Sequence, residues 1–203
     1  MSWLKTCLLT GAILFGLMSA MAQAQTNVRV RGIITSFNGR MLEVKTRDGN
    51  DLKMNVSENT TVSSLAELQI GDIKQGEFVG VTAAKKDQDG AQYALEVHIF
   101  PETSRGTGEG HYDWDLGPGT TMTNANVDAL VELNNGKELT LSYKGGIQKI
   151  IVPPKTPIVT FVPTEQSQLQ TGVQVFAVVQ QAEDGTLTAK RILISKDGIK
   201  PPM

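Results

Sequence analysis

The side chains best suited to chemistry are concentrated in one glycine-rich segment, residues 101–120. Five glycines there are interspersed with these ionisable and aromatic residues: Arg105, Glu109, His111, Tyr112, Asp113, Trp114 and Asp115. In an extended chain, side chains two positions apart share a face, so the odd-numbered residues from Glu109 to Asp115 would line one side. Tyr112, Trp114 and Leu116 would line the other side.

Two interpretations of this segment follow. In the first, it binds a divalent cation or a small ligand. The candidate ligand-binding residues are Arg105, Glu109, His111, Asp113, Trp114 and Asp115, and the candidate metal ligands are His111 and Asp113. In the second, Tyr112 and Trp114 fill the seam between two flanking domains and the polar side is solvated. Apart from a possible divalent metal ion, we expect no cofactor.

Hydrolysis is an alternative function for the same residues. His111 could act as a general base that a neighbouring aspartate orients. However, no serine stands in a Gly-x-Ser-x-Gly elbow, and the single cysteine is Cys7, near the N-terminus. We therefore expect a protein without catalytic activity. His98 alternates with Val97 and Ile99, which predicts the outward face of a strand; a site that it shares with His111 is a further hypothesis.

The first 24 residues have the organisation of a secretory signal peptide. Lys5 supplies the positive start, residues 8–18 the apolar core, and residues 20–22 or 22–24 a small-x-small cleavage site. An uncleaved anchor is the alternative, but polar residues interrupt the stretch before the ~20 apolar residues of a spanning helix. We therefore expect a bacterial protein of the periplasm or the extracellular space, with neither a transmembrane segment nor a cysteine after cleavage.

The rest of the chain contains the same pattern twice, at residues 28–100 and 121–195. Turn glycines and apolar residues recur at a spacing of 97, then 96, then 95 positions, as in these pairs: Gly39 and Gly136, Gly76 and Gly172, Gly90 and Gly185. Two one-residue deletions bring the copies into register. Such a pattern is typical of a duplicated fold.

Each copy carries the signals of β-structure. Apolar and polar residues alternate with period two, and pairs such as Asn38-Gly39 and Asp48-Gly49 mark tight turns between the runs. We expect five or six short strands per copy and one helical turn, near residues 64–68 and 164–169. Closure of such strands predicts an all-β protein of two tandem OB-like barrels, with residues 101–120 as the junction and 196–203 as a tail. One continuous β-sandwich is the alternative.

Residues 30–62, 70–81 and 184–192 resemble a bacterial exported domain family of unknown function. The resemblance covers both copies and implies a small β-barrel, used singly or in tandem, with no established catalytic residues. The formal net charge of -2 lacks the basic footprint of a DNA- or RNA-binding protein. We therefore expect a binding or structural module whose partner is a protein, a glycan or a small molecule outside the cytoplasm.

Overall fold

The computed structural model describes residues 26–85 and 90–201, so the predicted signal peptide lies outside the described chain. The described residues form thirteen strands, all joined in one sheet, and three 3-10 turns, with no α-helix among them. The predicted all-β class is confirmed. Within residues 26–85 and 90–201, no helix has the length and apolar character needed to cross a bilayer.

The elements follow one another with short connections. The strands are β1 (Thr26–Phe37), β2 (Met41–Thr46), β3 (Asp51–Asn55), β4 (Thr61–Leu68), β5 (Phe78–Lys85), β6 (Gln92–Ile99), β7 (Gly110–Asp113), β8 (Thr120–Leu133), β9 (Gly136–Tyr143), β10 (Gly146–Val152), β11 (Ile158–Pro163), β12 (Gln174–Gln181) and β13 (Leu187–Ile194). The 3-10 turns are η1 (Ile70–Asp72), η2 (Glu102–Ser104) and η3 (Gln166–Gln168).

Five strands close into a mixed barrel. β5 pairs with β6 and β8, and β9 pairs with β8 and β10, all antiparallel. The ring closes where β10 runs parallel to β6 at Ile150 and Ile151. Alternate side chains point into the interior, where Leu139, Leu141 and Ile150 are fully buried. This set of five strands is called the barrel below.

Eight strands lie outside the barrel, and five of them form a second group, the β1 lobe: β1, β2, β3, β12 and β13. β1 pairs with β12 and β2, β2 with β3, and β12 with β13, all antiparallel. β13 also meets β3 in a parallel pair at Thr188 and Asn55. The core of this lobe contains Ile34, Leu42 and Ile192, none of them accessible to solvent.

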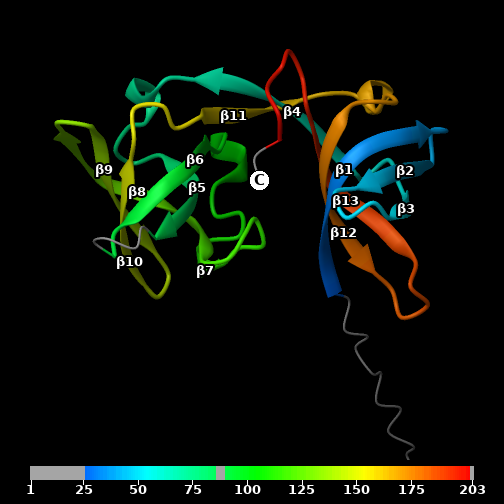
Figure 1. Ribbon diagram of the computed structural model, residues 1–203, viewed down its shortest axis with the longest axis horizontal. Helices are drawn as coiled ribbons and strands as arrows, with labels where there is room; N and C mark the ends of the chain where they lie inside the picture. Colours follow the sequence, from blue (N-terminus) through cyan, green and yellow to red (C-terminus); the bar gives the residue numbers. More distant parts are fainter. Residues whose placement is uncertain (1–25, 86–89, 202–203) are drawn as a thin grey trace, which may run out of the picture.

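Two strands join the barrel to the β1 lobe. β4 lies between β13, to which it is parallel, and β11, to which it is antiparallel; β11 in turn runs parallel to β6. Figure 1 shows β4 and β11 crossing together from one half of the molecule to the other. The remaining strand, β7, pairs with β8. The two halves are therefore held by continuous strand pairing.

The strand partners differ from the expected arrangement, in which residues 28–100 and 121–195 each close on themselves. The barrel combines β5 and β6 from the first range with β8, β9 and β10 from the second, and the β1 lobe combines β1, β2 and β3 with β12 and β13. Alternation determines which face of a strand is buried, but it does not determine which strand pairs with it. The sequence pattern therefore does not show whether a strand pairs with a neighbour in its own range or with a strand of the other range.

The helical turns were predicted correctly in one range and incorrectly in the other. Residues 64–68 belong to β4, because Ser64 pairs with Ile194 on one side and Val162 on the other, and pairing on both sides requires extended backbone. The turn follows as η1, where the Asp72 carboxylate accepts the Gln69 backbone N–H at 2.8 Å. In the second range, η3 falls within the predicted residues 164–169.

Candidate functional site

A cleft of about 260 Å³ lies between the barrel and the β1 lobe. Strands from both halves and the junction segment form its walls. Its polar lining consists of Asn27, Arg29, His98, Thr107, Tyr112, Trp114, Asn124 and Arg191, and its apolar lining of Phe100, Met122, Phe161, Phe176, Val178 and Leu193. No aspartate or glutamate is among these lining residues. We call this cavity the interlobe cleft.

The junction segment directs two aromatic rings into the interlobe cleft. β7 pairs with β8, and Tyr112 stands opposite Met122, so both face the cleft. Beyond β7, the chain turns back through a loop that Thr120 closes: its backbone oxygen accepts the Trp114 N–H at 2.8 Å, and its hydroxyl donates to the Trp114 oxygen at 2.8 Å. Trp114 then lies 6.1 Å from Tyr112 and 6.4 Å from Phe176, between ring centroids. The predicted face of Tyr112 and Trp114 is thus turned toward the seam between the two halves.

Two arginines of β1 hold the end of the junction segment. Arg31 donates two hydrogen bonds to the carboxylate of Asp115, at 2.7 and 2.9 Å. These bonds keep the pKa of Asp115 below its ordinary value. Arg29 lies with its guanidinium carbon 4.1 Å from the Trp114 ring centroid, in cation–π geometry. The segment is therefore clamped to the β1 lobe by one bidentate ion pair and one stacked cation.

Arg191 of β13 brings a positive charge into the cleft. In the described part of the chain, its guanidinium has no hydrogen bond or ion pair, although the residue is only half-exposed. Burial lowers the pKa of Arg191 below its ordinary value, and the opposing influence comes from Tyr112. A desolvated cation without a counter-ion is costly, and proteins retain such groups where a ligand completes them.

Asn124 of β8 is held in the cleft by one end of its amide. It is 6% exposed, and its Nδ2 donates to the Thr107 oxygen at 3.1 Å and to the Tyr112 hydroxyl at 3.3 Å. Its Oδ1 is buried and has no hydrogen-bond partner among the described residues. The indole Nε1 of Trp114 is likewise buried without a partner. Because buried polar atoms are nearly always hydrogen-bonded, these two atoms make the wall of the cleft less stable than a fully paired one would be.

His98 forms the floor of the cleft between two phenylalanines. Alternation predicted that His98 points away from Val97 toward the outward face, but the side chain is only 4% exposed because Phe100 and Phe161 pack against its ring. Phe100 and Phe161 contact it edge-on, with ring centroids at 4.9 and 5.2 Å. A side chain on Gly80 would collide with the imidazole, so the glycine makes room for the ring.

The buried imidazole faces a buried carboxylate. The Nδ1 of His98 lies 3.7 Å from Oε1 of Glu96, and neither atom has a hydrogen-bond partner in the described chain. Burial raises the pKa of Glu96, while the neighbouring His98 acts in the opposite direction. His98 lines the interlobe cleft, whereas Glu96 borders a separate cavity near Glu67 and Lys200.

The polar residues predicted from the junction segment do not come together. Arg105 binds Glu102, Asn126 and the Gly76 oxygen, and Glu109 accepts the backbone N–H of Lys144 at 2.9 Å. These bonds direct the two side chains to separate parts of the barrel. Of the six predicted ligand-binding residues, Trp114 alone lines the interlobe cleft.

His111 faces away from the cleft. Its Nδ1 lies 2.8 Å from the Thr123 hydroxyl, its ring stacks on Tyr143, and burial lowers its pKa below the ordinary value. Asp113 is exposed beside it, and Asp115 is bound to Arg31. Among residues 26–85 and 90–201, no group of three or more His, Cys, Asp or Glu side chains is placed to hold a metal ion.

The sequence interpretation missed Arg29, Asn124 and Arg191. One signal was present, because Arg191 directly precedes the apolar run Ile192, Leu193 and Ile194 within a single strand. However, the cleft forms only when strands distant in the sequence pair, and this pairing could not be predicted from the alternation of either copy.

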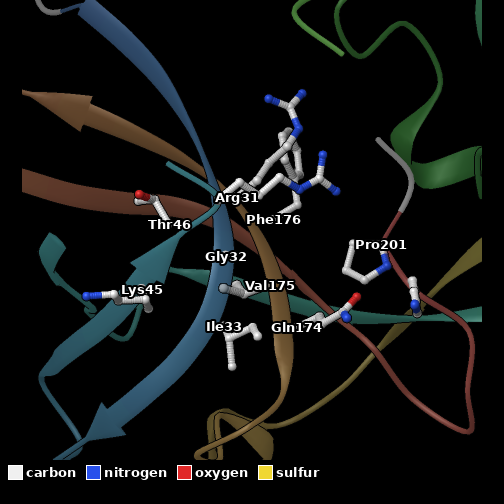
Figure 2. A pocket seen from close by; sticks show the side chains of 11 residues that line it. Arg31, Gly32, Ile33, Lys45, Thr46, Gln174, Val175, Phe176 and Pro201 are labelled. Atoms are coloured by element: carbon white, nitrogen blue, oxygen red, sulfur yellow. The ribbon is translucent and has the colours of Figure 1, made fainter. Parts of the chain in front are cut away.

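A second cavity, of about 430 Å³, lies along β1, β2 and β12 beside the end of the chain (Figure 2). It is lined by four cations: Arg31, Lys45, Arg47 and Lys200. Two of them are already neutralised, Arg31 by Asp115 and Lys45 by Asp51. The interlobe cleft is therefore the stronger candidate, because it combines a cation without a counter-ion with buried polar atoms that lack partners.

Comparison with known proteins provides no further assignment: no family profile matches the chain, and no curated protein or solved structure shows significant similarity.

Proposed function

We propose that this chain is an exported, non-catalytic binding module that holds a small molecule in the interlobe cleft. The observation that carries the proposal is the set of unsatisfied groups around one cavity. Arg191 has no counter-ion there, and the buried Trp114 Nε1 and Asn124 Oδ1 have no hydrogen-bond partners in the described chain. An anionic ligand would pair with Arg191, and concave sites with a few convergent polar groups are typical of small-molecule binding.

Export is part of the same proposal. The leader at residues 1–24 would direct the chain to the bacterial periplasm or the medium. The resemblance to an exported bacterial domain family agrees with this destination. The ligand would then be a small molecule or the end of a glycan or protein chain outside the cytoplasm.

We further propose that the architecture arose from an internal duplication of a small OB-like barrel. Two reciprocal bonds support this origin: the Gly76 N–H donates to the Val127 oxygen at 2.8 Å, and the Gly172 N–H donates to the Ile34 oxygen at 2.8 Å. Each bond joins the turn before the last two strands of one range to the first strand of the other range. Exchange of strands between the copies would place the interlobe cleft where equivalent surfaces meet.

The competing role is purely structural, with Tyr112 and Trp114 as packing between the halves. The two roles differ in their response to added small molecules. Dialysed protein is incubated with the small-molecule fraction of an extract from the source cells, and its melting temperature and Trp114 emission are recorded.

Binding raises the melting temperature, because a ligand that binds only the folded state stabilises it by mass action. It also changes the emission of Trp114, which lines the cleft. The Arg191→Gln variant should show a smaller response. If the melting temperature and the emission of the wild type both stay constant, the structural role is correct and the binding function is not.

A further inference from the structure

The electrostatics of the interlobe cleft favour a negatively charged ligand. Arg29 and Arg191 line it, and no carboxylate does. Arg29 lies 3.8 Å from Asp115, but that carboxylate is already bound to Arg31 through two hydrogen bonds. Arg191 is uncompensated in the described chain. The cleft lining therefore carries an excess of positive charge, and Arg191 is its cation without any counter-ion.

The donors available favour a carboxylate as the negative group. A guanidinium presents two parallel N–H groups that match the two oxygens of a carboxylate. A phosphate dianion is bound in most sites by several cations or by backbone N–H groups at a helix N-terminus. The cleft lining has no lysine, and residues 26–85 and 90–201 contain no α-helix.

The walls favour a flat ring as the body of the ligand. Trp114, Tyr112 and Phe176 present tilted aromatic surfaces, with adjacent ring centroids 6.1 and 6.4 Å apart. Aromatic pairs prefer offset or tilted packing at such separations, so a further ring fits against these walls. The volume of about 260 Å³ is below the range of about 300–1,000 Å³ that holds drug-sized ligands. A molecule with one ring matches that size.

We propose that the interlobe cleft binds a one-ring aromatic carboxylate, with the carboxylate on Arg191 and the ring against Trp114. This inference rests on the proposed binding function and names its ligand class.

The test uses benzoate as the probe, and isothermal titration calorimetry on the purified protein measures its affinity. Benzamide has the same shape without the charge, and acetate has the charge without the ring. Benzoate should bind about tenfold more tightly than either compound. Equal affinity for benzamide would overturn the role of Arg191, and equal affinity for acetate would overturn the role of the ring.

Two variants locate the site. Arg191→Gln should weaken benzoate binding about tenfold, and Arg191→Lys, which keeps the charge but not the planar fork, should give an intermediate loss. Arg40→Gln, in the exposed turn between β1 and β2, is the matched control and should bind as the wild type does. Thermal melting of each variant verifies that it is folded. Unchanged affinity in both Arg191 variants would overturn the inference.

Failure of this inference can be distinguished from failure of the proposed function. Protein that responds to the cell extract but does not bind benzoate has a ligand of another class, which contradicts the inference alone. Protein that responds to neither contradicts both.

Discussion

Arg191 places a positive charge in a half-buried wall where the described residues provide no counter-ion. In the empty protein this arrangement is unfavourable, because the guanidinium loses hydration and gains no ionic partner. Such a loss of stability is typical of functional sites, because binding surfaces are selected for their ligands and not for the stability of the free protein.

The first prediction follows from this cost. Arg191→Gln removes the charge and should stabilise the ligand-free protein by about 1 kcal/mol, which corresponds to a rise of about 2–4 °C in melting temperature. Differential scanning calorimetry on dialysed protein measures it. The control is Arg105→Gln, which breaks contacts with Glu102 and Asn126 and should lower the melting temperature. A comparable destabilisation by Arg191→Gln would mean that this guanidinium is a structural support.

Glu96 provides a second prediction, concerning pH. Burial raises the pKa of Glu96 in the folded state, while His98 at 3.7 Å opposes the shift. A raised pKa means that the folded state binds the proton more tightly. The contribution of protonated Glu96 to the free energy of unfolding is fully present below the unfolded pKa of about 4.3. It is lost as the pH rises through the folded pKa. Burial of Glu96 therefore stabilises the protein less at neutral pH than in acid.

Glu96→Gln keeps the shape and removes the ionisation. The variant should be more stable than the wild type at pH 7, and the difference should shrink toward pH 4. Urea unfolding across this interval gives the free energies of unfolding. Glu67 and Lys200, which border the same neighbouring cavity, are left unchanged. A variant that is less stable at pH 7 would show that the ion pair with His98 outweighs the cost of burial.

At the scale of single elements, the junction segment depends on the β1 lobe for its position. Asp115 binds Arg31 through two hydrogen bonds, and the adjacent Trp114 stacks under Arg29. The alternation of the segment correctly predicted that Tyr112 and Trp114 share a direction. The partners of its polar residues could not be predicted, because Arg31 and Thr123 lie in strands, and Lys144 in a turn, that contact the segment only in the folded protein.

The third prediction tests this clamp. Asp115→Asn should destabilise the protein by about 0.5–1 kcal/mol, the usual range for a partly exposed ion pair, and should shift Trp114 emission to longer wavelength as the ring becomes more accessible. The lowered pKa of Asp115 means that its contribution is present above the ordinary carboxylate pKa and disappears as the pH falls through the folded value. The free energies of unfolding of the wild type and of Asp115→Asn should therefore become equal at acidic pH.

Fluorescence and urea unfolding at pH 7 measure both effects. Asp48→Asn, in the exposed turn between β2 and β3, is the control for loss of one negative charge. Identical emission spectra for the wild type and Asp115→Asn would show that Trp114 is held without the clamp.

At the scale of the whole molecule, the barrel and the β1 lobe each combine strands from the first half of the sequence with strands from the second. The positions of most strands followed from alternation and turn glycines, such as the hairpin glycines Gly39 and Gly49, which have φ of 91° and 81°. The partners of those strands did not follow, because each copy offers the same pattern to the other. The candidate site was therefore only partly predictable: its aromatic face lay within one segment, but Arg191 and Asn124 reach it from opposite halves.

The fourth prediction follows from this combination of strands from both parts of the sequence. A specific protease site inserted after Gly106, and then cut, should leave two fragments that stay associated in gel filtration. Each half of the molecule needs strands from both fragments to complete its core. The uncut protein with the same insertion is the control. Separation into two folded fragments would indicate that each copy closes on itself.

Native mass spectrometry of the protein purified from its own cells tests the central claim, a ligand in the interlobe cleft, most directly. The wild-type protein should carry a non-covalent small molecule, whereas Arg191→Gln, prepared in the same way, should have the mass of the polypeptide alone. A wild-type protein with no bound molecule, or the same molecule retained equally by both proteins, would contradict a binding site built around Arg191.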